Sequence, residues 1–261
     1  MPAGRHADPV PGGPRLRARV LGKVLPVDVE IIAFDVFGTL VDWHTSIGAA
    51  LAEVGGRAGI DADWAALAGA WRARYRPTLA RVVAGELPFE SLDALHRRML
   101  DELAAGGGTG GPLQALSDAD RDQLVRAWHR LRPWPDSVPA LTKLREHHIV
   151  TPLSNGGMGL LTRLARAAAL PFDCILSAEL AGTYKPDPRV YRLVSRYLDV
   201  PPDRVLMVAC HPDDLEAAAR EGLRTGFFPR PREWGPDGTA PPPPDDVDVA
   251  AGDLLSLAAL V

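Results

Sequence analysis

The spacing of hydrophobic positions changes along the chain. An unbroken apolar run from 29 to 34 predicts a strand that is buried on both faces, as in parallel sheets. From 45 to 132 the apolar residues recur at helical spacing, for example at Ile47, Leu51 and Val54, and no stretch alternates convincingly as a strand does. From about 133 onward, short apolar runs alternate with amphipathic helical stretches. This alternation predicts a parallel, doubly wound sheet.

The pattern therefore predicts an α/β fold with an inserted, all-helical cap subdomain. Residues 28–44 and 133–261 are expected to form the core, and residues 45–132 the cap. Further core strands are expected at 148–153, 174–177, 205–209 and 225–228. The Pro-rich stretch 229–246 is expected to be an extended surface loop before a short helix at 250–260. Residues 1–27, rich in Pro, Gly and Arg, are expected to be a disordered leader.

Composition removes several classes of function. The 261 residues carry a formal net charge of −4, so no basic field favours nucleic acid or a membrane surface as a partner. Cys174 and Cys210 are the two cysteines, which excludes a disulfide scaffold and favours a reducing cytoplasm. Neither cysteine lies in a metal-ligand spacing. No segment of the sequence is apolar and long enough to span a bilayer. Together with the two cysteines, this leads us to expect a cytoplasmic protein.

Polar residues stand where the predicted strands end. Asp35 ends the first strand, and Gly38 allows a sharp turn whose backbone N–H groups suit an anionic ligand. The other polar residues at strand ends or helix starts are Thr39, Ser154, Asn155, Lys185, His211, Asp213 and Asp214. Taken singly, each has an ordinary explanation as a turn residue, a helix cap or a solvated side chain. Because the carboxyl ends of parallel strands share one edge, we expect these residues to lie together.

The combination of sequence motifs is more informative than any one of them. The motifs DVFGT at 35–39, LSN at 153–155, YKPD at 184–187 and DD at 213–214 together resemble the haloacid dehalogenase superfamily, and the resemblance runs from about 28 to 257. It implies a Rossmann-like core, with Asp35 as the nucleophile, Ser154 after the second strand, Lys185, and an acidic motif that includes Asp214.

Position 37 distinguishes branches of this superfamily. Phosphatases normally carry a second Asp there to protonate the leaving alkoxide, whereas this chain has Phe37. Loss of that acid should slow a phosphatase by about 10²–10⁴-fold, but chloride or bromide leaves without a proton. The Mg²⁺ ion of a phosphatase would also weaken Asp35 as a nucleophile toward carbon. The expected electrophile is therefore carbon, with no metal and no cofactor. A divergent Mg²⁺-dependent phosphohydrolase remains an alternative.

A second match lies in the expected cap. Ala70-Trp71-Arg72 resembles the helical Trp-Arg of the type II, or L-2-haloacid dehalogenase, branch, in which the Arg reaches the halogen and the substrate. Carried over to this chain, the resemblance implies Asp35, Lys185, Asp214 and Arg72 as catalytic residues, and Val36, Phe37, Thr39, Arg72, Ser154, Asn155, Tyr191 and His211 as substrate or halide contacts. It also implies a homodimer.

The implied reaction has two steps. Asp35 attacks Cα of a short-chain 2-haloalkanoate or haloacetate, and water then hydrolyses the resulting ester, so the hydroxy acid forms with inverted configuration. Asp214 is the expected base for the water, with His211 as a competitor. His211 departs from the best-known members, which have Asn there and Ser at the place of Ala209. Two further possibilities are weak Mg²⁺ binding by Asp213 and Asp214, and a non-catalytic relative that binds a carboxylate.

Overall fold

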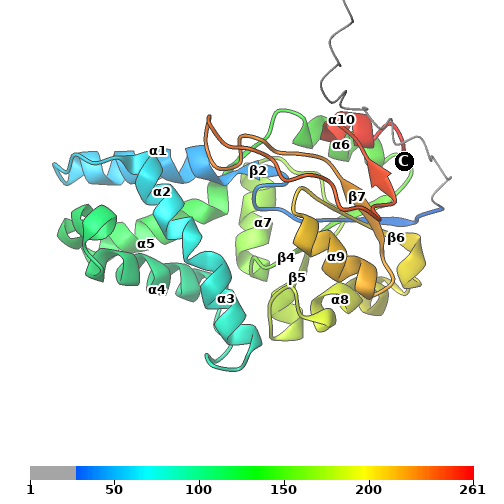
Figure 1. The fold of residues 1–261 in the computed structure, drawn as a ribbon, viewed down its shortest axis with the longest axis horizontal. Coiled ribbons are helices and arrows are strands. Elements are labelled where there is room, and N and C mark those ends of the chain that lie inside the picture. Colours follow the sequence, from blue (N-terminus) through cyan, green and yellow to red (C-terminus); the bar gives the residue numbers. More distant parts are fainter. Residues whose placement is uncertain (1–27) are drawn as a thin grey trace, which may run out of the picture.

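A parallel sheet of six strands forms the centre of the molecule in the computed structural model, which describes residues 28–261 (Figure 1). The strand order is β5-β4-β1-β6-β7-β8, and each neighbouring pair is parallel. The strands are β1 (Ile31–Phe34), β4 (Ile149–Ser154), β5 (Leu176–Ser177), β6 (Val205–Ala209), β7 (Arg224–Phe227) and β8 (Val249–Ala250). The predicted α/β core is confirmed, and the predicted leader at 1–27 lies outside the described residues.

The position of β1 explains its continuous apolar sequence. It pairs with β4 on one side and β6 on the other, and all four of its residues are buried. Phe34 lies opposite Pro152 and Val208, and the next backbone N–H, that of Asp35, donates to the Val208 carbonyl over 3.0 Å. Asp35 is therefore held rigidly at the centre of the sheet edge where parallel strands end.

Helices cover both faces of the sheet. In Figure 1, α6 and α10 lie on one side, and α8 and α9 lie on the other. The helices of this region are α6 (Ser137–Leu144), α7 (Met158–Ala167), η3 (Ala178–Ala181), α8 (Pro188–Leu198), η4 (Pro202–Arg204), α9 (Pro212–Arg220) and α10 (Leu254–Leu257). Helix α8 begins as its sequence predicts, because the Asp187 side chain accepts from the Arg189 N–H and Pro188 occupies the first turn. None of the described helices is long and apolar enough to cross a membrane.

A group of helices lies beside the sheet (Figure 1). It consists of α1 (Trp43–Arg57), α2 (Trp64–Ala73), α3 (Tyr75–Val83), α4 (Leu92–Ala105), η1 (Gly108–Ala115), α5 (Asp118–Ala127) and η2 (Trp128–Arg130). Two short antiparallel strands, β2 (Val41–Asp42) and β3 (Arg132–Pro133), join this group to the core. This ribbon was not predicted, because a strand of two residues shows no periodicity.

The C-terminal part differs from the prediction in two respects. The expected helix at 250–260 is replaced by the edge strand β8 followed by the shorter helix α10, because the Thr225 N–H and hydroxyl pair with Asp248 and dock this segment on β7. The expected surface loop at 229–246 is also wrong in part. Its residue Glu233 is only 6% exposed, because its carboxylate bonds to Trp43 and His211. This loop therefore contributes a wall of the site described next.

Candidate active site

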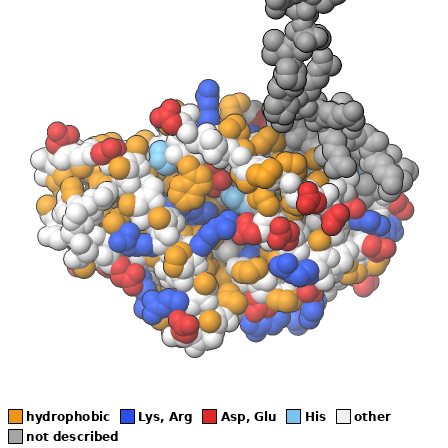
Figure 2. All heavy atoms as spheres, in the orientation of Figure 1, with side chains coloured by type: hydrophobic (Ala, Val, Ile, Leu, Met, Phe, Trp, Pro, Cys, Tyr) orange, Lys and Arg blue, Asp and Glu red, His pale blue; other side chains and the backbone are white. Residues whose placement is uncertain are grey.

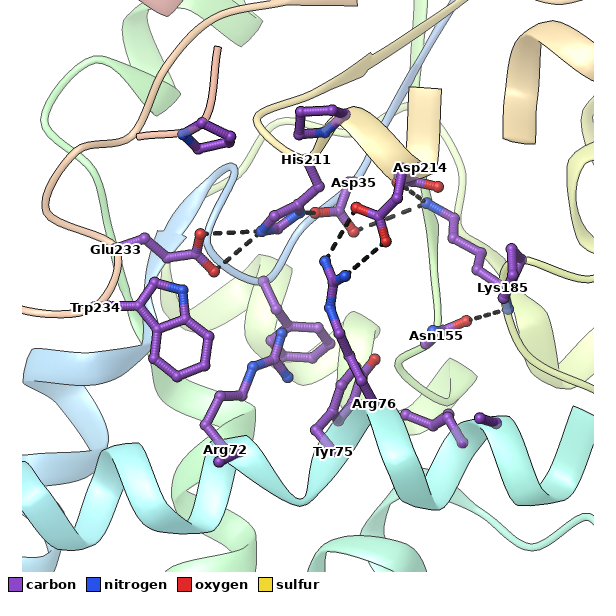
Figure 3. A pocket seen from close by; sticks show the side chains of 18 of the residues that line it. Asp35, Arg72, Tyr75, Arg76, Asn155, Lys185, His211, Asp214, Glu233 and Trp234 are labelled. Carbon is purple, nitrogen blue, oxygen red and sulfur yellow. Dashed lines mark hydrogen bonds and ion pairs between the residues drawn. The ribbon is translucent and has the colours of Figure 1, made fainter. Parts of the chain in front are cut away.

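A cavity of about 550 Å³ lies between the carboxyl edge of the sheet and the helices α2 and α3 (Figure 3). Figure 2 shows acidic, basic and histidine side chains at the surface between the helical group and the sheet, where this cavity lies. The predicted site residues that line it are Asp35, Phe37, Arg72, Asn155, Lys185, Tyr191, His211 and Asp214. Val36, Thr39 and Ser154 are buried and lie outside the lining. Residues from distant parts of the sequence thus meet in one pocket.

The two carboxylate oxygens of Asp35 have different surroundings. Oδ2 accepts the Thr39 hydroxyl over 2.8 Å and lies 3.1 Å from Nδ1 of His211. Oδ1 faces the Lys185 ammonium at 3.8 Å and has no hydrogen-bond donor from another side chain within residues 28–261. Burial alone would raise the pKa of Asp35, but Lys185, His211 and Thr39 outweigh it and hold that pKa well below its ordinary value. Asp35 is therefore an anion with one oxygen, Oδ1, left for reaction.

Lys185 is fixed by groups on the core. Its Nζ lies 2.7 Å from Oδ2 of Asp214, and its backbone N–H donates to Oδ1 of Asn155 over 2.8 Å. Tyr191 donates its hydroxyl to the other oxygen of Asp214 over 2.7 Å. Burial and the Asp35 charge raise the pKa of Asp214 despite its contact with Lys185. Asp214 thus holds Lys185 beside Asp35 with one oxygen, while Tyr191 occupies and orients the other.

Arg72 reaches the cavity from α2 and is 9% exposed (Figure 3). Its guanidinium stacks on the Tyr75 ring with 3.9 Å between Cζ and the ring centroid. The ring centroids of Phe37, Trp43 and Trp128 lie within 5.8 Å of the same Cζ atom. Among the described residues, no hydrogen-bond partner is found for its Nη1 atom. A buried cation with an unpartnered donor inside an aromatic cage is suited to receive an anion.

His211 bridges two carboxylates. Its Nδ1 faces Asp35, and its Nε2 lies 3.0 Å from Oε2 of Glu233 (Figure 3). Trp43 donates its Nε1–H to Oε1 of Glu233 over 3.1 Å and fixes the carboxylate. Burial would lower the pKa of His211, but the Cys210 sulfur and the bonds to Asp35 and Glu233 outweigh it and raise that pKa well above its ordinary value. The resting side chain is therefore an imidazolium that donates to both neighbours.

Several lining residues were missed by the sequence interpretation. Glu233 lies in a Pro-rich loop without periodicity, so the sequence carries no signal of its burial. Tyr75 and Arg76 follow Arg72 by three and four positions, which places them near it on adjoining helical turns and was the available signal. Arg76 lies 2.7 Å from Asp213 of α9 and so joins α3 to the core. Asp213 faces this cation and Asp214 faces Lys185, an arrangement unlike a shared Mg²⁺ site.

The comparisons with known proteins agree with this geometry. The family model of haloacid dehalogenase-like hydrolases matches residues 29–222. The chain belongs to this family of hydrolases. Within it, the similarity is to the L-2-haloacid dehalogenase branch, as the sequence resemblance indicated.

Three relatives show the extent of the similarity. The chain is 32% identical over 203 residues to (S)-2-haloacid dehalogenase 4A of Burkholderia cepacia, covering 74% of this chain and 79% of that protein. A defluorinating L-2-haloacid dehalogenase of known crystal structure is 41% identical, with a TM-score of 0.84 and coverage of 88% of this chain and 94% of the other. A second crystallised L-2-haloacid dehalogenase is 40% identical, with a TM-score of 0.81 and coverage of 88% and 98%.

Proposed function

We propose that this protein is a hydrolytic dehalogenase that converts L-2-haloacids and haloacetates of short chain length to 2-hydroxy acids and halide. The observation that carries the proposal is the pairing of Asp35 with Phe37. Asp35 is an ionised carboxylate with one free oxygen, and Phe37, at the position of a phosphatase's acid, contributes only an apolar wall. This arrangement suits a leaving group that departs without a proton.

The first step is displacement at carbon. Oδ1 of Asp35 attacks Cα from the side opposite the halogen; the O–Cα bond forms as the Cα–halogen bond breaks, and the halide leaves with the bonding electron pair. Oδ2 is held by Thr39 and His211, which leaves Oδ1 as the more nucleophilic oxygen. The substrate carboxylate must approach an anion in a poorly hydrated site, and the Lys185 ammonium at 3.8 Å from Oδ1 offsets that repulsion.

The departing halide is received by Arg72. The unpartnered Nη1 supplies a hydrogen-bond donor, and the surrounding rings exclude water from the forming anion. Stacking on the uncharged ring of Tyr75 holds the guanidinium in place without neutralising it. Arg72 therefore keeps its charge for the anion that the reaction produces.

The second step hydrolyses the ester, and we assign its base to His211 backed by Glu233. Ester formation removes the negative charge of Asp35, so the Nδ1 proton of His211 is released to solvent. Nδ1 then accepts a proton from water as that water attacks Cγ of the ester, while Nε2–H stays bonded to Glu233. As the tetrahedral intermediate collapses, the Cγ–O bond to the substrate breaks and the intermediate's own hydroxyl proton passes to the leaving alkoxide, which returns the Asp35 carboxylate and frees the hydroxy acid. The released proton and halide balance the overall hydrolysis.

Asp214 was the expected base, with His211 as the competitor. The contacts of Asp214 favour a different role, since Lys185 and Tyr191 engage its two oxygens. We therefore propose that Asp214 positions Lys185, while His211, which lies against Asp35, activates water. The distinction is testable because the two roles affect different steps.

Halide release measures the proposed activity directly. We expect L-2-chloropropionate and chloroacetate to release chloride in the presence of EDTA, with D-lactate as the inverted product of the former, and Asp35→Asn to abolish release. A generic aryl phosphate with Mg²⁺ serves as the comparison substrate. Phosphate release that needs Mg²⁺, without chloride release, would assign the protein to the phosphohydrolases instead. Binding of 2-haloacids without turnover would indicate the non-catalytic relative.

Two further expectations accompany this function. We propose a cytoplasmic homodimer, as the family resemblance implies, and the presence of two free cysteines, Cys174 and Cys210, supports a reducing compartment. Light scattering coupled to size exclusion measures the mass in solution. A mass of 28.0 kDa would contradict the dimer, because that is the mass of one chain.

A further inference from the structure

Three donor atoms of different kinds converge at one end of the cavity. Sγ of Cys210 lies 3.6 Å from Nε2 of His211 and 3.9 Å from Oε2 of Glu233, and Nε2 lies 3.0 Å from the same oxygen. Figure 3 shows the imidazole edge of His211 facing the Glu233 carboxylate. Cys210 is 1% exposed, whereas His211 and Glu233 line the cavity and give access to this point.

These separations are close to those of the ligands around a thiophilic divalent ion. In a tetrahedral zinc site, bonds of about 2.3 Å to sulfur and about 2.0–2.2 Å to nitrogen and oxygen require donor separations of about 3.4–3.6 Å. The Sγ–Nε2 separation of 3.6 Å lies in that range, the Sγ–Oε2 separation of 3.9 Å lies just above it and the Nε2–Oε2 separation of 3.0 Å just below it, so small side-chain shifts would bring all three donors to bonding distance. A fourth position would face the cavity and remain for water, as in zinc sites with three protein ligands.

The surroundings of the donors also resemble those of a metal site. The second ring nitrogen of His211, Nδ1, lies 3.1 Å from a carboxylate oxygen of Asp35, an arrangement that orients metal-ligating histidines. Trp43 donates to the Oε1 atom of Glu233 and leaves Oε2 directed at His211 and Cys210. Thiolate, imidazole and carboxylate together favour zinc over magnesium, which prefers oxygen ligands alone.

We propose that Cys210, His211 and Glu233 form a binding site for zinc, and that its occupation stops ester hydrolysis. The inhibitory part rests on the proposed function, in which His211 is the base. A metal on Nε2 fixes the Nδ1–H bond to Asp35, so Nδ1 cannot take a proton from water. The same metal draws Glu233 away from its role beside Nε2. Zinc would then act as a reversible inhibitor of an enzyme that needs no metal for turnover.

Cobalt provides a test that is independent of activity. We expect the EDTA-treated protein to bind one equivalent of Co²⁺ with a thiolate-to-cobalt charge-transfer absorption, and Zn²⁺ to displace it. Cys210→Ser should abolish that absorption and weaken zinc binding by more than the about 10–100-fold that loss of a ligand's hydrogen-bond partner costs. Cys174→Ser is the matched control, because Cys174 precedes β5 outside the cavity lining, and it should bind both ions as the parent protein does. Binding without a thiolate band, or a band that survives Cys210→Ser, would overturn the site.

Chloride release tests the inhibition separately. Stoichiometric Zn²⁺ should abolish turnover, EDTA should restore it, and Mg²⁺ at the same concentration should have no effect. Cys210→Ser should retain measurable chloride release in EDTA, and Zn²⁺ at the concentration that stops the parent protein should not reduce that release. Undiminished turnover of a protein shown spectroscopically to hold zinc would refute the inhibitory part. Absence of chloride release in EDTA would refute the proposed function, while the cobalt spectrum would still report on the metal site.

Discussion

A β-carbon on Gly38 would overlap the Oε1 atom of Glu233, 195 positions further along the chain. Gly38 also has φ of +87°, a conformation that L side chains rarely adopt. The glycine of the first turn therefore has two functions in the structure. It turns the chain after Asp35, and it leaves the space in which Glu233 reaches His211.

Replacement of Gly38 separates these two functions when it is compared with a second glycine. Gly38→Ala should lower the free energy of unfolding by more than the roughly 1–2 kcal/mol of the backbone conformation alone, because Glu233 must also move. Gly85→Ala is the control, since Gly85 has φ of +78° but open space where an added β-carbon would lie. Urea unfolding should show a similar backbone cost in both variants and an additional loss of stability only in Gly38→Ala. Only Gly38→Ala should also lower kcat. Equal effects would argue against the contact with Glu233.

His211 and Asp214 should differ in what accumulates during turnover. His211→Gln should slow ester hydrolysis by about 10²–10⁴-fold, the usual contribution of a general base, and so trap the ester on Asp35. Asp214→Asn should slow ester formation as well, because it releases Lys185. Intact-mass spectra after mixing with L-2-chloropropionate should therefore show the adduct in the first variant. An adduct confined to Asp214→Asn would return the role of base to Asp214.

The carboxylate of Glu233 should determine the acid limb of the pH profile. Its bond to Nε2 is among the causes that raise the pKa of His211, so Glu233→Gln should lower that pKa. The base must be unprotonated in the ester, and kcat therefore falls as the pH drops below this pKa. A lower pKa of His211 moves the acid limb of the kcat profile to lower pH. The plateau value of kcat also falls, because the neutral amide in Glu233→Gln would stabilise the imidazolium formed during hydrolysis less than the carboxylate does. A limb that stays in place would show that His211 does not govern hydrolysis.

The ring of Tyr75 should matter more than its hydroxyl. Its face carries the Arg72 guanidinium at 3.9 Å, a contact worth about 1–2 kcal/mol when desolvated. Tyr75→Leu should therefore reduce kcat/KM for L-2-chloropropionate by about 5–30-fold, because Arg72 loses its fixed position. Tyr75→Phe keeps the ring and should stay within a few-fold of the parent. Equal losses in the two variants would instead assign the effect to the hydroxyl.

The sequence predicted those site residues whose positions follow from the order of strands and helices along the chain. Asp35, Asn155 and Asp214 follow strands, and the carboxyl ends of parallel strands share one edge of the sheet, so the strand pattern alone placed them together. The helical spacing of the inserted segment likewise predicted its helices. Phe37 was interpreted from its chemistry, and the cavity places it against Arg72 as a wall residue.

The parts of the site and fold that the sequence did not predict depend on contacts between segments that are distant in the chain. Glu233 lies in a loop without periodicity, and only the folded chain shows that Gly38 makes room for it. The same holds for Cys210, whose relation to Glu233 across 23 positions has no counterpart in sequence spacing. The two-residue strand β8 was missed because its pairing with β7 depends on the side chain of Asp248 rather than on its own pattern.

The ion pair between Arg76 and Asp213 should affect substrate capture more than stability. Both side chains are more than half exposed, and such pairs contribute about 0–1 kcal/mol, so Arg76→Ala should change the melting temperature little. Arg76 nevertheless lines the cavity, and its loss removes a positive charge that attracts an anionic substrate. We expect kcat/KM for chloroacetate to fall several-fold at low ionic strength and to approach the parent value as salt screens the field. Arg192→Ala is the control, because the Arg192 side chain is as exposed as that of Arg76 and pairs with Glu221 outside the cavity lining. A loss that persists in high salt would indicate direct contact of Arg76 with the substrate rather than attraction at a distance.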